Sequence, residues 1–157
     1  VLSSIQSLAS EADTLPENSI SHLGKAQLIV RRLRGLAKAL RLNSSSAEQF
    51  IPTGLLGASG LNGSSLIKVI SPSDASSKEV KTKLSQIVQE MVAHSHAHLS
   101  SSCQLGGDNS RFCKLTHYTI SRFLDVLKRH DFDVLNQKVQ ITGSSRDGLL
   151  PFRLFFK

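Results

Sequence analysis

The stretch from Lys138 to Phe156, KVQITGSSRDGLLPFRLFF, decides the predicted fold class. Apolar and polar residues alternate in it, first from Lys138 to Thr142 and again from Phe152 onward, on either side of a turn that runs from Gly143 to Gly148. Alternation with a period of two is typical of strands, and a glycine-containing turn between two of them indicates a β-hairpin. Because a proline is tolerated only at a sheet edge, Pro151 is expected on an outer strand. The stretch therefore predicts an α+β fold.

Upstream of this stretch, three segments carry the periodicity of amphipathic helices, with apolar residues at steps of three and four. They are predicted at residues 18–42, 77–98 and 111–129, and the second begins at a capping-box pair, Ser76 and Glu79. The apolar positions are Ile29, Leu33, Leu36 and Leu40 in the first, Val80, Leu84, Ile87 and Met91 in the second, and Leu115, Phe123 and Leu127 in the third. A shorter helix before Pro16 is also expected.

The remaining segments read as connections and one strand. Residues 43–65 contain three successive serines, a proline and glycines at 54, 57, 60 and 63, which indicates a loop. Leu66–Ile70 is a short apolar run with β-branched members before Pro72, which predicts a strand. We expect one domain over residues 1–157, with a helical portion at 1–42, a Gly/Ser-rich loop at 43–65 and an α+β portion at 66–157.

The predicted order from residue 18 is helix, strand, helix, helix, strand, turn, strand. A winged helix has this order, with its third helix offered to the partner and its hairpin forming the wing. The likeness is one of element order, and no diagnostic motif accompanies it.

Composition favours a folded, soluble, intracellular domain, nuclear or cytoplasmic. The chain has 157 residues with 39% apolar side chains, and no apolar run is long enough for a membrane span. It begins at Val1, so we expect a fragment of a longer protein. Two cysteines are too few for a disulfide framework.

Basic residues exceed acidic ones by 19 to 12, which gives a net charge of +7 and favours anionic partners. Residues 111–157 hold most of the excess, with nine basic and four acidic groups. Between Lys25 and Arg41 there are six basic residues and no acid. At helical spacing, Arg31, Arg34, Lys38 and Arg41 form one stripe. Such a stripe fits a phosphate backbone, an acidic protein, an anionic membrane surface or simply a solvated helix face.

A second stripe runs along the predicted third helix and includes the only tyrosine. Its members are Arg111, Lys114, Tyr118, Arg122 and Arg129, interrupted by Asp125. In a winged helix this would be the recognition helix, and the hairpin would add Lys138, Arg146 and Arg153. A solvated face is the alternative.

Histidines and cysteines gather between residues 94 and 117: His94, His96, His98, Cys103, Cys113 and His117. The two residues of each pair, His94/His98 and Cys113/His117, are one helical turn apart. Imidazole and thiolate groups at this spacing can serve as zinc ligands. Their spacing fits no standard zinc finger, so helix-end histidines and structural cysteines are the other interpretation, and we expect no metal or other cofactor. Catalysis by Cys113 and His117 would need an orienting group and an oxyanion site that the sequence does not supply.

The leading hypothesis is therefore a non-catalytic nucleic-acid-binding module for DNA or RNA, using a basic helix face and a hairpin wing. The alternative is a protein-interaction domain of a larger intracellular assembly. In that case the basic helix meets an acidic partner, and Leu55, Leu56 and Leu61 meet an apolar groove. No small-molecule substrate is evident, and an enzyme would require a deep pocket around the histidines and cysteines.

Overall fold

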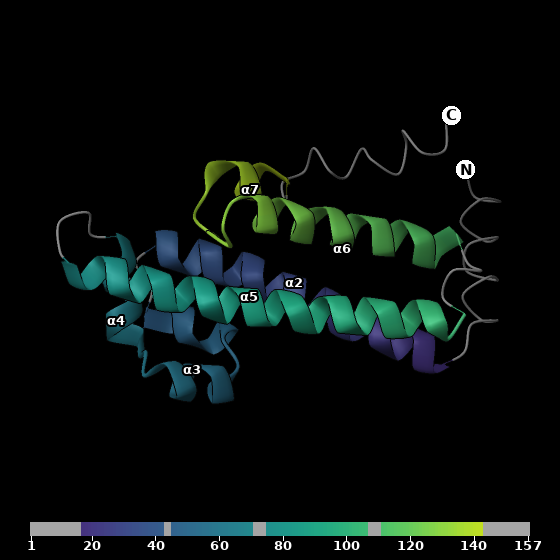
Figure 1. Cartoon of the computed structure of the whole chain (residues 1–157), viewed down its shortest axis with the longest axis horizontal. Coiled ribbons are helices and arrows are strands. Elements are labelled where there is room, and N and C mark those ends of the chain that lie inside the picture. Colours follow the sequence, from purple (N-terminus) through teal and green to yellow (C-terminus); the bar gives the residue numbers. More distant parts are fainter. Residues whose placement is uncertain (1–16, 43–44, 71–74, 107–110, 143–157) are drawn as a thin grey trace.

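The structure, a computed structural model, describes residues 17–42, 45–70, 75–106 and 111–142 (Figure 1). These residues form the α-helices α2 (Glu17–Arg41), α3 (Thr53–Ser59), α4 (Gly63–Ile67), α5 (Ala75–Gln104), α6 (Arg111–Arg129) and α7 (Gln137–Thr142), and the 3₁₀ helices η1 (Ser45–Phe50) and η2 (Lys68–Ile70). The described residues contain no strand. The predicted α+β fold and the winged-helix architecture are therefore wrong.

Helices α2 and α5 form the centre of the fold and run antiparallel along their lengths (Figure 1). Leu33, Leu36 and Leu40 of α2 are buried, and so are Leu84, Ile87 and Met91 of α5. These are the residues that the helical periodicity placed on the apolar faces, so burial of the two stripes against each other accounts for the pairing.

At the other end of the pair, small polar residues contribute to the contact beside buried apolar residues such as Leu99. Ser19 and Ser102 are buried, and each hydroxyl donates to the other residue's carbonyl oxygen at 3.0 Å. Ser95, also buried, donates to the carbonyl oxygen of Ala26 at 3.3 Å. Because each of these three buried hydroxyls has a hydrogen-bond partner, the cost of removing it from water is offset and the helices can approach closely there.

Helix α6 packs on α2 and α5 through buried Cys113, Ile120, Phe123, Leu124 and Leu127, and α7 folds back beside it (Figure 1). The three long helices form a bundle. Helices α2 and α6 are confirmed within one residue of the predicted ends, whereas α5 extends beyond the predicted 77–98 segment at both ends.

The predicted hairpin is wrong in the part that the structure describes. Lys138, Val139 and Ile141 lie in α7, where Val139 is buried and Ile141 is half exposed. Val139 contacts the core through the helix side that faces α6, while Lys138 is exposed as the alternation also required. Six residues with one buried valine satisfy either period, and here tertiary packing selects the helix. The rest of the hairpin, with Arg146, Pro151 and Arg153, lies outside the described residues.

The described part of the Gly/Ser-rich segment, residues 45–65, is mostly helical rather than a loop, and a glycine and an asparagine in it cap two of the helices. Gly60 ends α3 in the left-handed region at φ 66°, and Asn62 begins α4 by accepting a hydrogen bond from the backbone N–H of Ser65 at 2.8 Å. The strand predicted at 66–70 is likewise wrong: Leu66 is buried in α4 and Val69 in η2.

Candidate docking site

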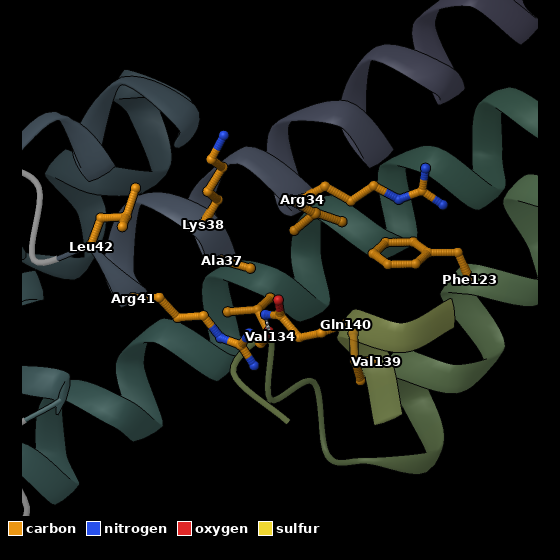
Figure 2. A pocket seen from close by; sticks show the side chains of 10 residues that line it. Arg34, Ala37, Lys38, Arg41, Leu42, Phe123, Val134, Val139 and Gln140 are labelled. Carbon is orange, nitrogen blue, oxygen red and sulfur yellow. Dashed lines mark hydrogen bonds between the residues drawn. The ribbon is translucent and has the colours of Figure 1, made fainter. Parts of the chain in front are cut away.

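A hollow of about 390 Å³ lies between α2, α6 and α7 (Figure 2). Its apolar lining comes from three separate elements: Leu33 and Ala37 of α2, Phe123 of α6, and Val134 and Val139 on and before α7. All five are at most 6% exposed as residues, so the hollow is a gap in the surface of the core. A hollow of this composition can take an apolar side chain out of water.

The charged residues on the rim of this hollow, which we call the basic hollow, are all basic. Arg34, Lys38 and Arg41 line it from α2, with Gln140 opposite and Leu42 at one end. Lys38 and Arg41 are exposed, and Leu42 is 69% exposed. No aspartate or glutamate is among the residues that line the hollow. An apolar floor beneath a rim whose charged residues are all basic has the chemistry to hold a ligand that is apolar in part and anionic in part.

The Arg34 side chain forms one wall through its contact with an aromatic ring. Its guanidinium carbon lies 4.8 Å from the centroid of the Phe123 ring, over the face of the ring (Figure 2). This cation–π contact joins α2 to α6 and places a positive charge directly above the apolar floor.

The opposite wall depends on a tight turn at the end of α6. Asp131 and Phe132 have positive φ values of 52° and 57°, and the Phe132 N–H donates to the carbonyl oxygen of Leu127 at 2.9 Å. Two successive left-handed residues reverse the chain and carry Val134 back toward α2. Asn136 then accepts from the Lys138 N–H at 3.0 Å, which starts α7.

Comparison with known proteins finds no matching family model, curated protein or solved structure. The hollow must therefore be interpreted from its own chemistry. Of the described helices, none has the length and apolarity required to cross a membrane.

The structure separates the residues of the first predicted basic stripe. Arg34, Lys38 and Arg41 come together at the hollow, whereas Arg31 is exposed and does not line it. Arg32, which the stripe omitted, is exposed as well. Three residues of the stripe therefore lie beside apolar residues at the hollow, and the binding role predicted for the stripe stays a prediction.

The second predicted stripe lies on the outer surface of α6. Lys114, Tyr118, Arg122 and Arg129 are exposed, as is the intervening Asp125. The side chain of Arg111 lies outside the described part. Arg129 lines a polar hollow of about 560 Å³ between α5 and the α6–α7 turn.

That polar hollow has both signs of charge. Lys78, Lys81 and Arg129 line it together with Asp131 and Asp133, and Lys81 forms an ion pair with Asp133 at 3.1 Å. Since its charges partly neutralise one another, it gives a weaker electrostatic preference than the all-basic rim.

The histidine and cysteine cluster does not assemble into a metal centre among the described residues. Cys113 is buried and Cys103 is partly buried. His98 instead contacts a histidine that sequence reasoning passed over: its Nδ1 lies 3.0 Å from Nδ1 of His22 on α2. Burial lowers the pKa of His98, and positive charge on His22, Lys25 and His94 lowers it further.

Neither the basic nor the polar hollow includes a histidine or cysteine of this cluster, so neither supplies the pocket that the enzyme hypothesis required. The leucines proposed to meet a partner from the 43–65 segment are also covered. Leu61 is buried, and Leu55 and Leu56 are half-buried against the core. Docking through that segment is therefore disfavoured.

Sequence reasoning missed the apolar half of the site, namely Ala37, Val134 and Val139. Ala37 and Val139 look like ordinary core positions, and Val134 follows a turn whose left-handed residues are not glycines. The hollow exists only because three elements meet imperfectly there. The one available signal was the acid-free stretch that contains Arg34, Lys38 and Arg41.

Proposed function

We propose that this chain is a non-catalytic protein-interaction domain that binds an acidic, partly apolar segment of a partner protein. The observation that supports the proposal is the hollow between α2, α6 and α7, whose apolar floor is bordered by Arg34, Lys38 and Arg41 and by no acid. In this proposal, the basic hollow is the binding site for the partner segment.

Both parts of the hollow contribute to binding in distinct ways. Burial of an apolar side chain on the floor of Phe123, Val134 and Val139 supplies affinity, at about 25 cal/mol for each Å² removed from water. Carboxylates beside exposed Lys38 and Arg41 supply orientation, selection against basic partners and a faster association rate. The rim contacts are screened by salt, while the floor contacts are not.

The apolar floor favours a protein over a nucleic acid. A phosphate backbone would satisfy the basic rim, but it has no aliphatic group to fill a hollow lined by Leu33, Phe123 and Val139. An acidic protein segment with large apolar residues satisfies the rim and the floor together.

The test uses two synthetic acidic peptides of about 16 residues with the same composition of leucine, glutamate and alanine. In one, the leucines follow helical spacing; in the other, they alternate with glutamate as in a strand. Binding of labelled peptide is measured by fluorescence anisotropy for the wild-type chain and for the double variant Lys38→Glu/Arg41→Glu. Arg31→Glu/Arg32→Glu is the matched control, because it makes the same charge change on α2 at exposed positions outside the hollow.

The proposal predicts that at least one peptide binds the wild-type chain, and that Lys38→Glu/Arg41→Glu weakens this binding at least tenfold while the control variant weakens it less than threefold. Chemical-shift changes in an NMR titration should centre on Ala37, Phe123 and Val139. Equal losses in both variants would mean binding to general positive charge. That result, or tight binding of a DNA or RNA oligonucleotide that displaces the peptide, would refute the proposed function.

A further inference from the structure

We propose that the segment of the partner protein that occupies the basic hollow is a short amphipathic α-helix with an acidic face. When bound, this helix lies alongside α2. This inference rests on the proposed function and specifies the conformation and sequence pattern of the partner segment. It follows from the spacing of the rim, the size of the floor and the backbone of the walls.

The rim has the spacing of a helix. Arg34, Lys38 and Arg41 stand at steps of four and three on α2, so they follow one side of that helix over about 10 Å, at 1.5 Å per residue. A second helix lying beside α2 would present carboxylates at i and i+3 opposite exposed Lys38 and Arg41, at the same interval. In an extended chain, side chains on one face repeat at about 6.8 Å, so only some of them would fall opposite the rim.

The floor has room for more than one large side chain. A cavity of about 150 Å³ is sufficient for a benzene molecule, and the basic hollow has about 390 Å³. Two apolar residues one helical turn apart, at i and i+4, would fill it from the same face of a helix. Leu42, which is 69% exposed at the end of the hollow, would be covered by the next turn of the same helix.

The walls offer an incoming backbone nothing to pair with. The hollow is enclosed by α2, α6 and α7, and the described residues contain no strand and hence no sheet edge. An extended segment would gain no backbone hydrogen bonds from these walls, whereas a helix satisfies its own N–H and C=O groups internally. A helix placed against two others also completes the packing of a bundle through its side-chain ridges.

The charge pattern of this helix is therefore specific. Apolar residues lie at i and i+4 on the side that faces Phe123 and Val139. Acidic residues lie at the border of that side, opposite Lys38 and Arg41. Basic residues are excluded from this border, because a like charge beside Arg34 or Arg41 would raise the binding free energy.

The experiment compares the acidic peptide whose leucines follow helical spacing with two variants of that peptide. One carries proline at its central position, which prevents the helix but keeps the charge and the leucines. The other has lysine in place of each glutamate that faces the rim. Binding of all three to the wild-type chain and to Lys38→Glu/Arg41→Glu is measured by anisotropy, and the helicity of the bound peptide by circular dichroism.

We expect the helix-patterned peptide to bind with gain of helicity, and the proline peptide and the alternating peptide to bind at least tenfold more weakly. The lysine peptide should bind Lys38→Glu/Arg41→Glu at least fivefold more tightly than it binds the wild-type chain. This rescue requires a folded variant, so it separates loss of charge complementarity from loss of structure.

The two proposals fail in different ways. If the alternating or the proline peptide binds as tightly as the helical one, and its binding still depends on Lys38 and Arg41, the helical partner is refuted and the proposed function stands. If no peptide binds, or if no binding depends on Lys38 and Arg41, the proposed function is refuted and the helical partner with it.

Discussion

The two sides of α2 differ in how completely the rest of the chain packs against them. On one side, Gly35 faces η1, and the ring of Phe50 occupies the space that a Cβ would need: an added Cβ would lie 2.6 Å from Cδ1 of Phe50. On the other side, Ala37 faces the basic hollow, which no described residue fills. The same helix is thus sealed by its own chain along one side and left open along the other.

This difference indicates on which side of α2 close packing contributes to the stability of the fold and on which side it does not. A glycine inside a helix costs about 1 kcal/mol relative to alanine, so close approach of an aromatic ring is a physical reason for Gly35. The hollow beside Ala37, by contrast, is space that no described residue occupies, so an added ligand can pack there. Predictions that enlarge one residue on each side test this contrast directly.

The largest effect is expected for Gly35→Ala. The new methyl group would overlap the Phe50 ring, so η1 must shift away from α2, at a cost of about 2 kcal/mol in the free energy of unfolding. Urea denaturation followed by circular dichroism measures this loss.

Gly24→Ala is the matched control for that substitution. It lies in the same helix, and a Cβ there meets no other atom within 4 Å, so the variant should gain about 0.5–1 kcal/mol from helix propensity. If Gly35→Ala is instead stabilised, η1 does not pack closely against α2, and the two sides of the helix do not differ in packing.

A smaller effect is expected for Ala37→Leu on the open side. The larger side chain can extend into the hollow, so the free energy of unfolding should change by less than about 1 kcal/mol in either direction. Binding of the acidic helical peptide should nevertheless weaken at least tenfold, because the leucine occupies the floor. Strong destabilisation, as large as that of Gly35→Ala, would mean that the two sides are equally closed.

The sequence predicts the three long helices because each carries a periodic apolar stripe. The burial of Leu33, Leu84 and Leu127 confirms those stripes. The prediction of secondary structure from the sequence is wrong where the apolar pattern covers only a few residues. The alternation around Val139 fits a strand and a one-turn helix equally well, and the contact with the core decides between them. In the 43–65 segment, Gly60 and Asn62 act as helix caps, so residues typical of loops there mark the ends of helices.

The candidate site is half predictable for a related reason. Charge is visible in a linear sequence, so the acid-free stretch that holds Arg34, Lys38 and Arg41 is found without a structure. A hollow is a property of how elements meet. Its wall at Val134 depends on the left-handed turn at Asp131 and Phe132. Neither residue is a glycine, so the sequence carries no typical signal for this turn.

A modest gain in stability is expected for Asp131→Gly. Asp131 is exposed at φ 52°, a conformation that costs a non-glycine residue free energy, so glycine should raise the free energy of unfolding by about 0.5 kcal/mol. The same substitution at exposed Asp125, inside α6, should lower it by about the same amount. If both variants are destabilised, the turn that forms the wall of the basic hollow does not require a left-handed residue.

The smallest effect is a dependence on pH at the far end of α2, away from the basic hollow. His98 contacts His22 across the α2–α5 interface at 3.0 Å, and burial, followed by the charges of His22, Lys25 and His94, lowers the pKa of His98 below its ordinary value of 6.5. The folded chain therefore binds this proton more weakly than the unfolded chain. The free energy of unfolding should be highest above pH 6.5 and fall as the pH decreases from there toward the lowered pKa.

Thermal unfolding between about pH 5 and 8 measures this slope. We expect His98→Gln to flatten it, while His96→Gln, at an exposed position of the same helix, leaves it unchanged. Because neither His22 nor His98 lines the basic hollow, the affinity of His98→Gln for the acidic helical peptide at neutral pH should equal that of the wild-type chain. A loss of affinity in this variant would show that the two ends of α2 are coupled, and that the open side of the helix responds to the packing of its first turns.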